Sequence, residues 1–383
     1  MKIILAGGGT GGHTIPGIAL AQRIENDGGS KAMFITSSRE VDVHLMRRYG
    51  FRALHLAIQP FGANPMTWPR GLADGLLALR QANRAIEDFG PDAIVGLGGY
   101  VSFFPILAAK LRRLPIVLLE QNVIPGKATR WLAPFAQEIA CQWQETMRHL
   151  SVKVRARVTG NPVRAEVLAG TREVAARKLG LDPEKKTLLV LGGSQGSHAL
   201  NEMMIASAAG IAHLAPGLQV VHLSNKADHE RVEQAYKNAG IKAAVFTFLD
   251  EMDLAYSASD VALSRAGGTT IAEMAACGIP SILVPYPFAA DDHQRHNAQA
   301  LADAGAAVVL EQDAFCVDLL AGLICKFLDD EGLARRMHQA SLDKARPDAA
   351  NAIIEKLRSF VRTKPTAINL PALDPEPVGK EQQ

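Results

Sequence analysis

Two stretches of the sequence decide the fold: Lys2-Ile-Ile-Leu-Ala-Gly-Gly-Gly-Thr-Gly-Gly-His13 and Thr187-Leu-Leu-Val-Leu-Gly-Gly-Ser-Gln-Gly-Ser197. Each runs from a short apolar segment, typical of a buried parallel strand, through a glycine-rich turn into a helical pattern. Apolar segments alternate with helical patterns along the rest of the chain, which indicates βαβ units around parallel sheets. The two similar openings, one in each half, predict an α/β protein with two Rossmann-like domains.

The remaining predicted strands and the predicted boundaries follow from the same pattern. We expect domains at residues 1–161 and 162–346, because turn residues follow the seventh strand at Gly160-Asn-Pro162. Residues 347–362 indicate a final helix that crosses back to the first domain, and the proline-rich residues 363–383 a disordered tail. The predicted strands are Lys2–Ala6, Lys31–Thr36, Arg52–Ile58, Ala93–Gly96, Ile116–Leu119, Glu138–Cys141, Lys153–Thr159, Thr187–Leu191, Leu218–Leu223, Ala244–Phe248, Val261–Ser264, Ser281–Val284 and Ala307–Leu310.

Composition and charge exclude several classes of protein. The 383 residues exceed one ordinary domain, and 41 basic against 39 acidic residues leave a net charge of only +2. Because proteins that bind nucleic acid usually carry a strong basic excess, we expect no nucleic-acid partner. The four scattered cysteines show no zinc or disulfide spacing, and no apolar run approaches the ~18 residues of a membrane span. We therefore expect a cytoplasmic protein that at most touches a membrane surface.

The first glycine-rich turn, Gly7-x-Gly9-x-x-Gly12, matches the dinucleotide fingerprint, although glycines that only allow a tight turn give the same pattern. An NAD site needs an acid at the end of the second strand, but that strand ends Thr36-Ser-Ser-Arg39. Arg39 leaves NADP as a minor alternative. His13 lies at the mouth of the turn and is a candidate general base, since its ordinary pKa is ~6.5. The alternative is a first-turn histidine bonded only to backbone.

The stretch from Ser264 to Pro280 reads as a strand end, a glycine loop and a helix. The N–H groups that begin this helix suit a diphosphate, and Glu273 suits a ribose diol. Thr270-x-x-Glu273 also fits a capping box, in which Glu273 would only cap the helix. Ser194, in the second glycine-rich turn, is placed to bond a phosphate oxygen or is simply a turn serine. Together these residues predict a nucleotide diphosphate in the C-terminal half.

A polar stretch, Asp291-Asp-His-Gln-Arg-His296, follows the strand Ser281–Val284. The polarity of a loop explains such a stretch about as well as a function does. No Asp-x-Asp occurs, which disfavours a metal-held diphosphate, and His293 and His296 lack a third ligand at a telling spacing. We therefore expect neither a metal nor another cofactor.

Six motifs occur in an order that resembles the MurG family, the UDP-N-acetylglucosamine:lipid I N-acetylglucosaminyltransferases of peptidoglycan synthesis. The resemblance covers roughly residues 1–360. The motifs are Gly7-Gly-Gly-Thr-Gly-Gly-His13 followed by Pro16, Gly98-Gly-Tyr-Val-Ser102, Glu120-Gln-Asn122, Gly160-Asn-Pro-Val-Arg164, Gly192-Gly-Ser-Gln-Gly196 and Arg265-Ala-Gly-Gly-Thr-Thr-x-x-Glu273.

The resemblance implies a GT-B fold, with the donor nucleotide in the C-terminal domain and the acceptor in the N-terminal domain. It implies an inverting, metal-independent transfer of N-acetylglucosamine from UDP-N-acetylglucosamine to the 4-hydroxyl of N-acetylmuramic acid in lipid I, giving lipid II. The substrate-binding residues that it implies are Thr10, Gly11, Gly12, Asn122, Arg164, Ser194, Leu249, Gly268, Thr269, Thr270, Ile271, Ala272, Glu273 and Gln294.

Such a transfer needs one base, and we expect His13 to supply it, with Glu120 and Asp291 as rival candidates. Many members of the family carry Gln-Gln where this chain has His293-Gln294, so the part played by His293 in sugar recognition stays open. Two other functions also stay open. One is a UDP-N-acetylglucosamine epimerase on the same fold, and the other is an NADP-dependent oxidoreductase or regulatory module.

A lipid-linked acceptor implies that the N-terminal domain contacts the cytoplasmic face of an anionic membrane as a peripheral protein, with other cell-wall synthesis proteins as candidate partners. Apolar side chains lie beside basic ones in two stretches, a combination that suits such a surface. The helical series Leu72, Leu76, Leu79 and Ile86 is instead predicted to face the core. The two stretches are Met66, Trp68 and Arg70, and Lys110, Leu111, Arg112, Arg113 and Leu114.

Overall fold

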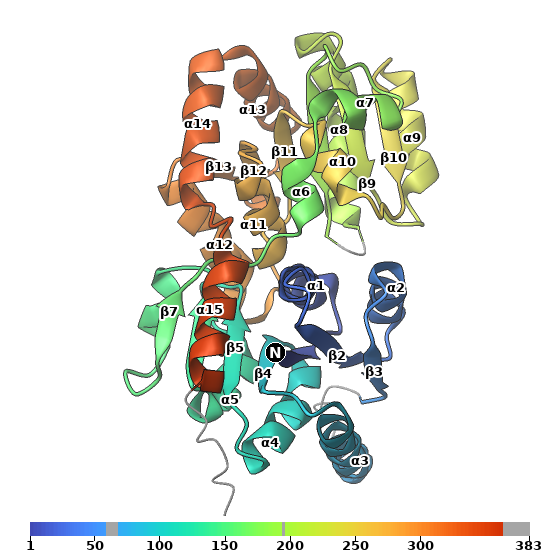
Figure 1. Cartoon of the computed structure of the whole chain (residues 1–383). Coiled ribbons are helices and arrows are strands. Elements are labelled where there is room, and N and C mark those ends of the chain that lie inside the picture. The colour runs from blue at the N-terminus through green and yellow to red at the C-terminus, as the bar shows by residue number, and fades with distance from the viewer. Residues whose placement is uncertain (59–67, 194–195, 363–383) are drawn as a thin grey trace, which may run out of the picture.

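The computed structural model describes residues 1–58, 68–193 and 196–362, with the side chains of helix α3 described from Ala73 onward. In these residues the chain forms two lobes, each built on a parallel sheet that helices cover (Figure 1). The predicted tail, residues 363–383, lies outside the described residues.

The sheet of the first lobe has seven described strands in the order β3-β2-β1-β4-β5-β6-β7, all parallel. The central strands are apolar and buried on both faces, as expected for parallel strands between two helical layers. The strands are β1 (Lys2–Gly7), β2 (Lys31–Ser37), β3 (Ala53–Leu56), β4 (Ala93–Gly98), β5 (Ile116–Glu120), β6 (Glu138–Cys141) and β7 (Ala156–Val158). The helices are α1 (Gly11–Glu25), α2 (Glu40–Tyr49), α3 (Trp68–Phe89), α4 (Phe103–Leu111) and α5 (Lys127–Leu132).

The second lobe repeats this plan with six described strands in the order β10-β9-β8-β11-β12-β13. In both lobes the order reverses beside the first strand, which is where open α/β sheets bind ligands. The strands are β8 (Thr187–Leu191), β9 (Gln219–Leu223), β10 (Lys242–Phe246), β11 (Val261–Ser264), β12 (Ser281–Leu283) and β13 (Ala307–Val309). The helices are α6 (Ala165–Ala169), α7 (Arg172–Lys178), α8 (His198–Leu214), α9 (His229–Asn238), α10 (Met252–Ser257), α11 (Gly268–Ala276), α12 (His293–Asp303), α13 (Val317–Asp329) and α14 (Glu331–Lys344).

The predicted fold class is confirmed, and all thirteen predicted strands are present in the described residues. The ends of several strands were predicted wrongly. The seventh strand is confined to Ala156–Val158, and the strand predicted at Ala244–Phe248 begins earlier, at Lys242. Strand ends are set by pairing with the neighbouring strand, which a single sequence does not contain.

The last helix, α15 (Ala349–Arg362), packs on the first lobe although it follows the second lobe in sequence (Figure 1). Its apolar stripe of Ala350, Ile353, Ile354 and Leu357 joins the cluster that also holds Ile3 and Leu5 of β1. The chain passes between the lobes at Gly160 and again at Arg346. A Cβ at Gly160, where φ is +83°, would overlap the Arg346 side chain, so the two crossings lie side by side.

Helix α3 corrects one prediction about packing. Ile86 is buried and Leu79 packs partly on the core, as expected, but Leu76 is 60% exposed, and the side chain of Leu72 lies outside the described residues. The buried stripe instead runs through the small residues Gly75, Ala78 and Ala82, and a Cβ at Gly75 would clash with the Phe104 ring of α4. Because α3 lies so close to its neighbour, its larger leucine is turned toward solvent.

Candidate active site

A cavity of about 640 Å³ lies between the lobes, at the carboxyl ends of strands from both sheets. Helix α11 lies at this junction beside α1 (Figure 1). The cavity brings together eleven residues singled out from the sequence: Thr10, Gly12, His13, Glu120, Asn122, Gly268, Thr269, Thr270, Asp291, His293 and Gln294.

His13 is a half-buried residue in the first turn of α1, on the first-lobe side of the cavity. Its Nδ1 lies 3.0 Å from the Thr10 hydroxyl oxygen. Burial lowers the pKa of His13 below its ordinary value, His293 acts in the same direction, and Asp42 opposes them. The imidazole is therefore neutral at neutral pH, the form in which a histidine accepts a proton.

Two glycines allow the imidazole of His13 to rest directly on the turn that follows β4. Gly98 and Gly99 have φ of +95° and +75°, and a Cβ at Gly98 would lie 2.8 Å from the His13 Cδ2 atom. Any side chain at Gly98 would displace the ring. The motif Gly98-Gly-Tyr-Val-Ser102 thus positions His13 from the neighbouring strand.

Helix α11 points its N-terminus into the cavity from the second lobe. Its N-cap residue is Gly267, no side chain caps it, and its first turn holds no acidic residue. The capping-box interpretation is therefore wrong, because Thr270 lies inside the helix rather than at its start. Exposed N–H groups at such a helix end form a site suited to an anion.

The N-terminus of α11 is also held against the first lobe. The Thr269 hydroxyl donates to the Gly12 carbonyl oxygen at 2.6 Å and accepts a hydrogen bond from Asn161 Nδ2 at 3.3 Å. At Gly268 any Cβ would overlap the Gln121 carbonyl oxygen. The glycine loop of the second lobe therefore fits directly against the loops that follow β1 and β5.

Glu273 and Arg164 lie outside the cavity and form a buried ion pair at 2.9 Å, with both side chains less than 5% exposed. The second carboxylate oxygen of Glu273 accepts a hydrogen bond from the Tyr256 hydroxyl at 3.0 Å. Arg164 also donates to the Tyr49 hydroxyl of α2 at 3.2 Å, while its Nη2 has no hydrogen-bond partner among the described residues. Burial opposes ionisation, but Glu273 holds the pKa of Arg164 above its ordinary value. Both oxygens of Glu273 are thus occupied by protein donors.

Glu120 ends β5 and holds the loop that follows that strand. Its carboxylate accepts hydrogen bonds from the backbone N–H groups of Asn122 and Gly126, at 3.0 and 2.9 Å, and from the Asn122 side chain. Burial raises the pKa of Glu120, although these donors oppose the shift. Asn122 in turn accepts a hydrogen bond from Asn297 Nδ2 of α12 at 3.0 Å, so the Asn122 side chain also links the two lobes.

Three predicted polar residues come from the start of α12 and the turn before it. The Gln294 side-chain oxygen accepts hydrogen bonds from the backbone N–H groups of Ala266 and Tyr286. His293 Nδ1 lies 2.8 Å from the Ala290 carbonyl oxygen, so Nδ1 carries a proton and donates it to that oxygen. Asp291 forms an ion pair with Arg130 of α5.

Other implied residues lie away from the cavity or outside the described residues. Leu249 and Ile271 pack on the core of the second lobe, and Ala272 lies beside the first chain crossing. Gly11 is buried in the first turn of α1. Ser194 lies outside the described residues.

Sequence reasoning missed Asp42, a buried acid of α2 that holds the first glycine-rich turn. Asp42 accepts hydrogen bonds from the Gly9 N–H at 2.7 Å and from the Thr14 hydroxyl at 2.6 Å. Arg39 donates to the Gly9 carbonyl oxygen at 3.0 Å. A bound NADP would need the Gly9 N–H and the Arg39 guanidinium, and both groups are already hydrogen-bonded within the protein. The sequence did contain a signal, an acid shortly after the second strand. The acid was expected within Thr36–Arg39, whereas Asp42 lies three residues after Arg39.

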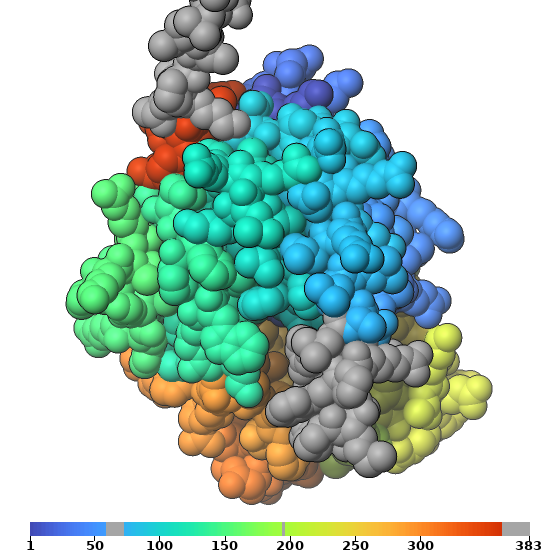
Figure 2. Space-filling view, turned by 90° about the horizontal axis from the view of Figure 1, so that it is seen from below, coloured from blue at the N-terminus to red at the C-terminus, as the bar shows by residue number. Residues whose placement is uncertain are grey.

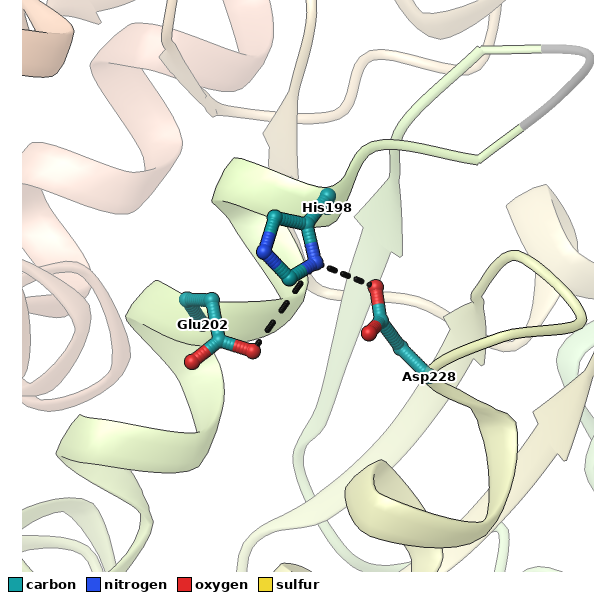
Figure 3. A group of neighbouring side chains, drawn as sticks. All are labelled: His198, Glu202 and Asp228. Atoms are coloured by element: carbon teal, nitrogen blue, oxygen red, sulfur yellow. Dashed lines mark hydrogen bonds and ion pairs between the residues drawn. The ribbon is translucent and has the colours of Figure 1, made fainter.

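A cluster of metal-ligating residue types lies in the second lobe, where His198, Glu202 and Asp228 converge (Figure 3). The cluster already contains a cation, because Arg231 Nη1 lies 2.6 Å from Glu202 and 3.3 Å from Asp228. Despite burial, hydrogen bonds from Asn201, His198 and Asn225 lower the pKa of Asp228 to about 2. These contacts stabilise the start of α8 and leave little coordination capacity for a metal.

The two Rossmann-like lobes and the cavity between their strand ends are those of the GT-B fold. The glycosyltransferase family 28 N-terminal domain matches residues 3–141, and the family's C-terminal domain matches residues 187–353. The chain belongs to this family and, within it, to the MurG family that its six motifs resemble, so it is a hexosyltransferase.

Curated relatives match the chain over nearly its whole length. The UDP-N-acetylglucosamine--N-acetylmuramyl-(pentapeptide) pyrophosphoryl-undecaprenol N-acetylglucosamine transferase of Halothermothrix orenii is 37% identical over 378 residues, covering 94% of this chain and 100% of the relative. The protein of the same name from Thermodesulfovibrio yellowstonii is 35% identical over 366 residues, covering 95% of this chain and 100% of the relative.

Solved structures agree on the fold. The crystal structure of Acinetobacter baumannii MurG has a TM-score of 0.71 at 25% identity, covering 94% of this chain and 99% of that chain. A UDP-GlcNAc 2-epimerase from Neisseria meningitidis, bound to UDP-GlcNAc, has a TM-score of 0.69 at 16% identity, covering 94% and 100%. The second likeness shows the fold alone, so it does not favour the epimerase alternative.

Proposed function

We propose that this protein transfers N-acetylglucosamine from UDP-N-acetylglucosamine to the muramyl 4-hydroxyl of lipid I, giving lipid II. The observation that carries the proposal is the cavity in which His13 of the first lobe lies opposite the open N-terminus of α11. A base on one side and an anion site on the other are what transfer from a nucleotide diphosphate requires. Full-length relatives named for this transfer support the choice of substrates.

In this proposal the donor diphosphate lies against the N–H groups of Gly268, Thr269 and Thr270. Gln294 directs its amide Nε2 to the sugar hydroxyls, since its oxygen is held by backbone N–H groups. Thr10, Gly11 and Gly12 contact the donor from the first lobe, and Asn122 lies near the sugar. Leu249, Ile271 and Ala272 complete the nucleotide site through the backbone or through packing. Ser194, which lies outside the described residues, is proposed to bond a phosphate oxygen.

Glu273 and Arg164 need a rearrangement before they contact a nucleotide. Because protein donors occupy both oxygens of Glu273, a ribose diol has to replace one of those donors. Arg164 also bonds Tyr49 of the other lobe, so separating the lobes loosens the pair. We propose that an opened cleft frees Glu273 for the ribose and lets Arg164 use its unpartnered Nη2.

The chemical step is a direct displacement with inversion. The muramyl 4-hydroxyl oxygen forms a bond to the anomeric carbon as the bond from that carbon to the UDP oxygen breaks. The hydroxyl proton passes to Nε2 of His13, whose Nδ1–H donates to Thr10. The electron pair of the broken bond leaves with UDP, whose charge the helix N-terminus stabilises without a metal.

The two rival bases are less suited to this step. The Glu120 carboxylate already accepts hydrogen bonds from the backbone N–H groups of Asn122 and Gly126. Through these bonds it holds the loop that positions Asn122, so it is less available to accept a proton. Asp291 is paired with Arg130. His13 is the neutral, cavity-lining group whose pKa lies below that of an ordinary histidine.

The test is an assay of the full-length protein with labelled UDP-N-acetylglucosamine and a short-chain lipid I analogue in EDTA. We expect a disaccharide product with a β-1,4 bond. An epimerised sugar nucleotide formed without acceptor would support the epimerase instead. The absence of turnover, or turnover abolished by EDTA alone, would contradict the proposal.

We further propose that the protein binds the cytoplasmic face of an anionic membrane through the first lobe. None of the helices in the described residues is long and apolar enough to cross a bilayer. Helices α3, α4 and α5 together form the lower face in Figure 1, which Figure 2 views directly. We name it the α3–α5 surface. The large apolar side chains exposed on these three helices are Leu76, Leu77, Leu111 and Trp131, and Trp131 also lines the cavity.

Basic residues flank the α3–α5 surface. Lys110, Arg112 and Arg113 are exposed beside Leu111, and Leu114 packs partly on the core. The side chains of Met66, Trp68 and Arg70 lie outside the described residues. Other cell-wall synthesis proteins remain candidate partners at the same membrane.

We also propose that the chain divides into residues 1–161 and 162–346, with residues 347–362 returning to the first domain. The support is the close approach of the two chain crossings at Gly160 and Arg346.

A further inference from the structure

Arg265 is a buried cation without a carboxylate partner among the described residues. It directly follows β11 and is 6% exposed. Its five N–H donors are all used, and every acceptor is uncharged. Nε donates to Ser197 Oγ at 3.2 Å, Nη1 to the carbonyl oxygens of Val284 and Pro285 at 3.1 and 3.0 Å, and Nη2 to Ser197 Oγ and Gln312 Oε1 at 3.0 and 2.7 Å.

A buried charge of this kind normally has a counter-ion, because neutral acceptors do not replace the hydration that the cation loses. Arg164 in the same lobe follows the rule, since it is paired with Glu273. Burial lowers the pKa of Arg265, the direction expected for a cation without an opposing charge, and Tyr286 only partly offsets this. The second lobe therefore holds an excess of positive charge at Arg265.

The surroundings of Arg265 add to this excess. Strands β8 and β11 are neighbours, and the helices that follow them, α8 and α11, each begin without an acidic residue in the first turn. Arg265 lies two residues before Gly267, the N-cap of α11, and bonds Ser197, the N-cap of α8. The carboxylate of Asp228 already lies against the first turn of α8 through His198 and Asn201, so the uncompensated positive charge at these adjacent strand ends comes from the guanidinium and from the N-terminus of α11.

Ser197 offers a way for this charge to act on a ligand. Its hydroxyl oxygen accepts hydrogen bonds from two N–H groups of Arg265 and from the Leu200 N–H at 3.4 Å. A hydroxyl oxygen has two lone pairs, so its acceptor capacity is filled and its proton is free to be donated. Donation next to a guanidinium is directed most favourably to an anion.

We propose that Arg265 is a positioning residue for the diphosphate of the donor. The diphosphate is the counter-ion that Arg265 lacks within the protein, and the Ser197 hydroxyl and the Gly267–Gly268 turn connect the two charges. The inference rests on the proposed function, because it needs a nucleotide diphosphate at the second lobe. Arg265 itself does not touch the ligand, since all its donors are used. It also provides the fixed positive charge that makes a metal unnecessary at this site.

The test measures how the full-length protein discriminates between ligands of different charge. Uridine, UMP and UDP compete with labelled UDP-N-acetylglucosamine for wild type, Arg265→Met and Arg265→Lys. We expect Arg265→Met to weaken UDP by about tenfold or more while uridine changes by about twofold at most, as removal of an electrostatic partner requires. Arg265→Lys should recover much of the UDP affinity, because it keeps the charge.

Arg172→Met is the matched control. Arg172 also donates to several carbonyl oxygens, those of Pro183, Ala258 and Lys185, but it lies at the amino ends of the strands and has Asp260 as its counter-ion. We expect Arg172→Met to leave the ratio of UDP to uridine affinity unchanged. The ratio is the decisive quantity, because a purely structural role for Arg265 weakens both ligands equally.

Equal losses for uridine and UDP in Arg265→Met, or no loss at all, overturn the inference. If Arg265→Met does not fold, Ser197→Ala decides. It removes the hydroxyl and keeps the guanidinium, and an unchanged ratio of UDP to uridine affinity in that variant overturns the inference. A wild-type protein that binds no UDP contradicts the proposed function as well, whereas normal UDP binding with an unaffected Arg265→Met contradicts the inference alone.

Discussion

In the part of the chain that the structure describes, His13 is held in place by groups from two neighbouring strand ends. Thr10 bonds its Nδ1, and the turn at Gly98-Gly99 supports the ring. We expect His13→Ala to lower kcat by about 10²- to 10⁴-fold, the usual share of a general base, and to leave the UDP dissociation constant within about twofold. Steady-state kinetics and UDP titration check this. A UDP affinity that falls as much as kcat would show that His13 binds the donor instead.

Glu273 should respond to substitution in the opposite way. We expect Glu273→Ala to lower the affinity for UDP by a larger factor than it lowers kcat. The substitution also leaves the buried Arg164 without its ion-pair partner. We expect the free energy of unfolding to fall by about 3–5 kcal/mol, the usual cost of breaking a buried ion pair. Urea denaturation and UDP titration of the same variant separate the two effects. Unchanged stability would contradict the buried pair, and unchanged UDP affinity would contradict the proposed contact with the ribose.

The acid limb of the pH profile should report the pKa of His13. A base has to be neutral to act, so kcat/KM falls as the pH drops through that pKa, which burial places below the ordinary ~6.5. His293 lowers it further, so His293→Gln should move the limb to higher pH. His296→Gln is the control, because His296 lies on the same helix but does not line the cavity. A limb that stays in place or moves to lower pH in His293→Gln contradicts this coupling.

At the residue scale, the sequence predicted the members of the cavity better than their bonds. The turn before α1 and the helix start at Gly268 follow rules that join glycines to strand ends, so their position was predictable. The pairing of Arg164 with Glu273 and of Asn122 with Asn297 was not. Those contacts depend on how distant segments meet, and no spacing in the chain encodes them.

At the scale of elements, β9 carries a histidine that makes the second lobe sensitive to acid. His222 is fully buried; it accepts a hydrogen bond from the Tyr236 hydroxyl at 2.8 Å and donates to Asn201 Oδ1 at 3.0 Å. Burial lowers the pKa of His222 to about 3. Between the ordinary value of ~6.5 and about 3, only the unfolded chain binds this proton, so stability is lost as the pH falls.

We therefore expect His222→Gln to depend less on pH than wild type. Between pH ~6.5 and ~5 the wild-type free energy of unfolding should fall by about 2 kcal/mol more than that of the variant. Urea denaturation at both pH values measures the difference. His213→Gln, at an exposed position on α8, should behave as wild type. Identical pH slopes for wild type and His222→Gln would contradict the account.

The α3–α5 surface gives a second prediction at this scale. Leu111 is 70% exposed on α4, and Leu111→Glu replaces an apolar contact with a negative charge. We expect binding to vesicles containing phosphatidylglycerol to weaken by about tenfold or more. Leu214→Glu, at an exposed leucine on α8 of the other lobe, is the matched control. Equal vesicle binding by the two variants would contradict this membrane surface.

Helix α3 also shows where periodicity misleads. The spacing of Leu72, Leu76, Leu79 and Ile86 suggests one apolar face, yet the stripe that packs on the sheet is made of smaller residues. Large leucines at the edge of a stripe serve a membrane surface as well as a core. A pattern of apolar residues therefore identifies the helix but not which apolar partner it meets.

At the scale of the molecule, the fold class and the presence of the thirteen strands follow from the repeated strand-turn-helix plan. The arrangement of the two lobes does not. Thr269 donates to the Gly12 carbonyl oxygen across the interface, and the His44 imidazole Nε2 lies 2.8 Å from Asp250 Oδ1 at its far edge. These contacts join residues that are more than 200 positions apart in the sequence, so no local rule predicts them.

The central claim is that the second lobe holds the nucleotide while the first lobe supplies the base. A crystal structure of the full-length protein with UDP-N-acetylglucosamine tests it most directly. We expect the diphosphate at the N-terminus of α11, next to Gly268, and the anomeric carbon facing His13 across the cavity. A diphosphate bound to the first glycine-rich turn at Gly7–Gly12, or a sugar turned away from His13, would contradict the account.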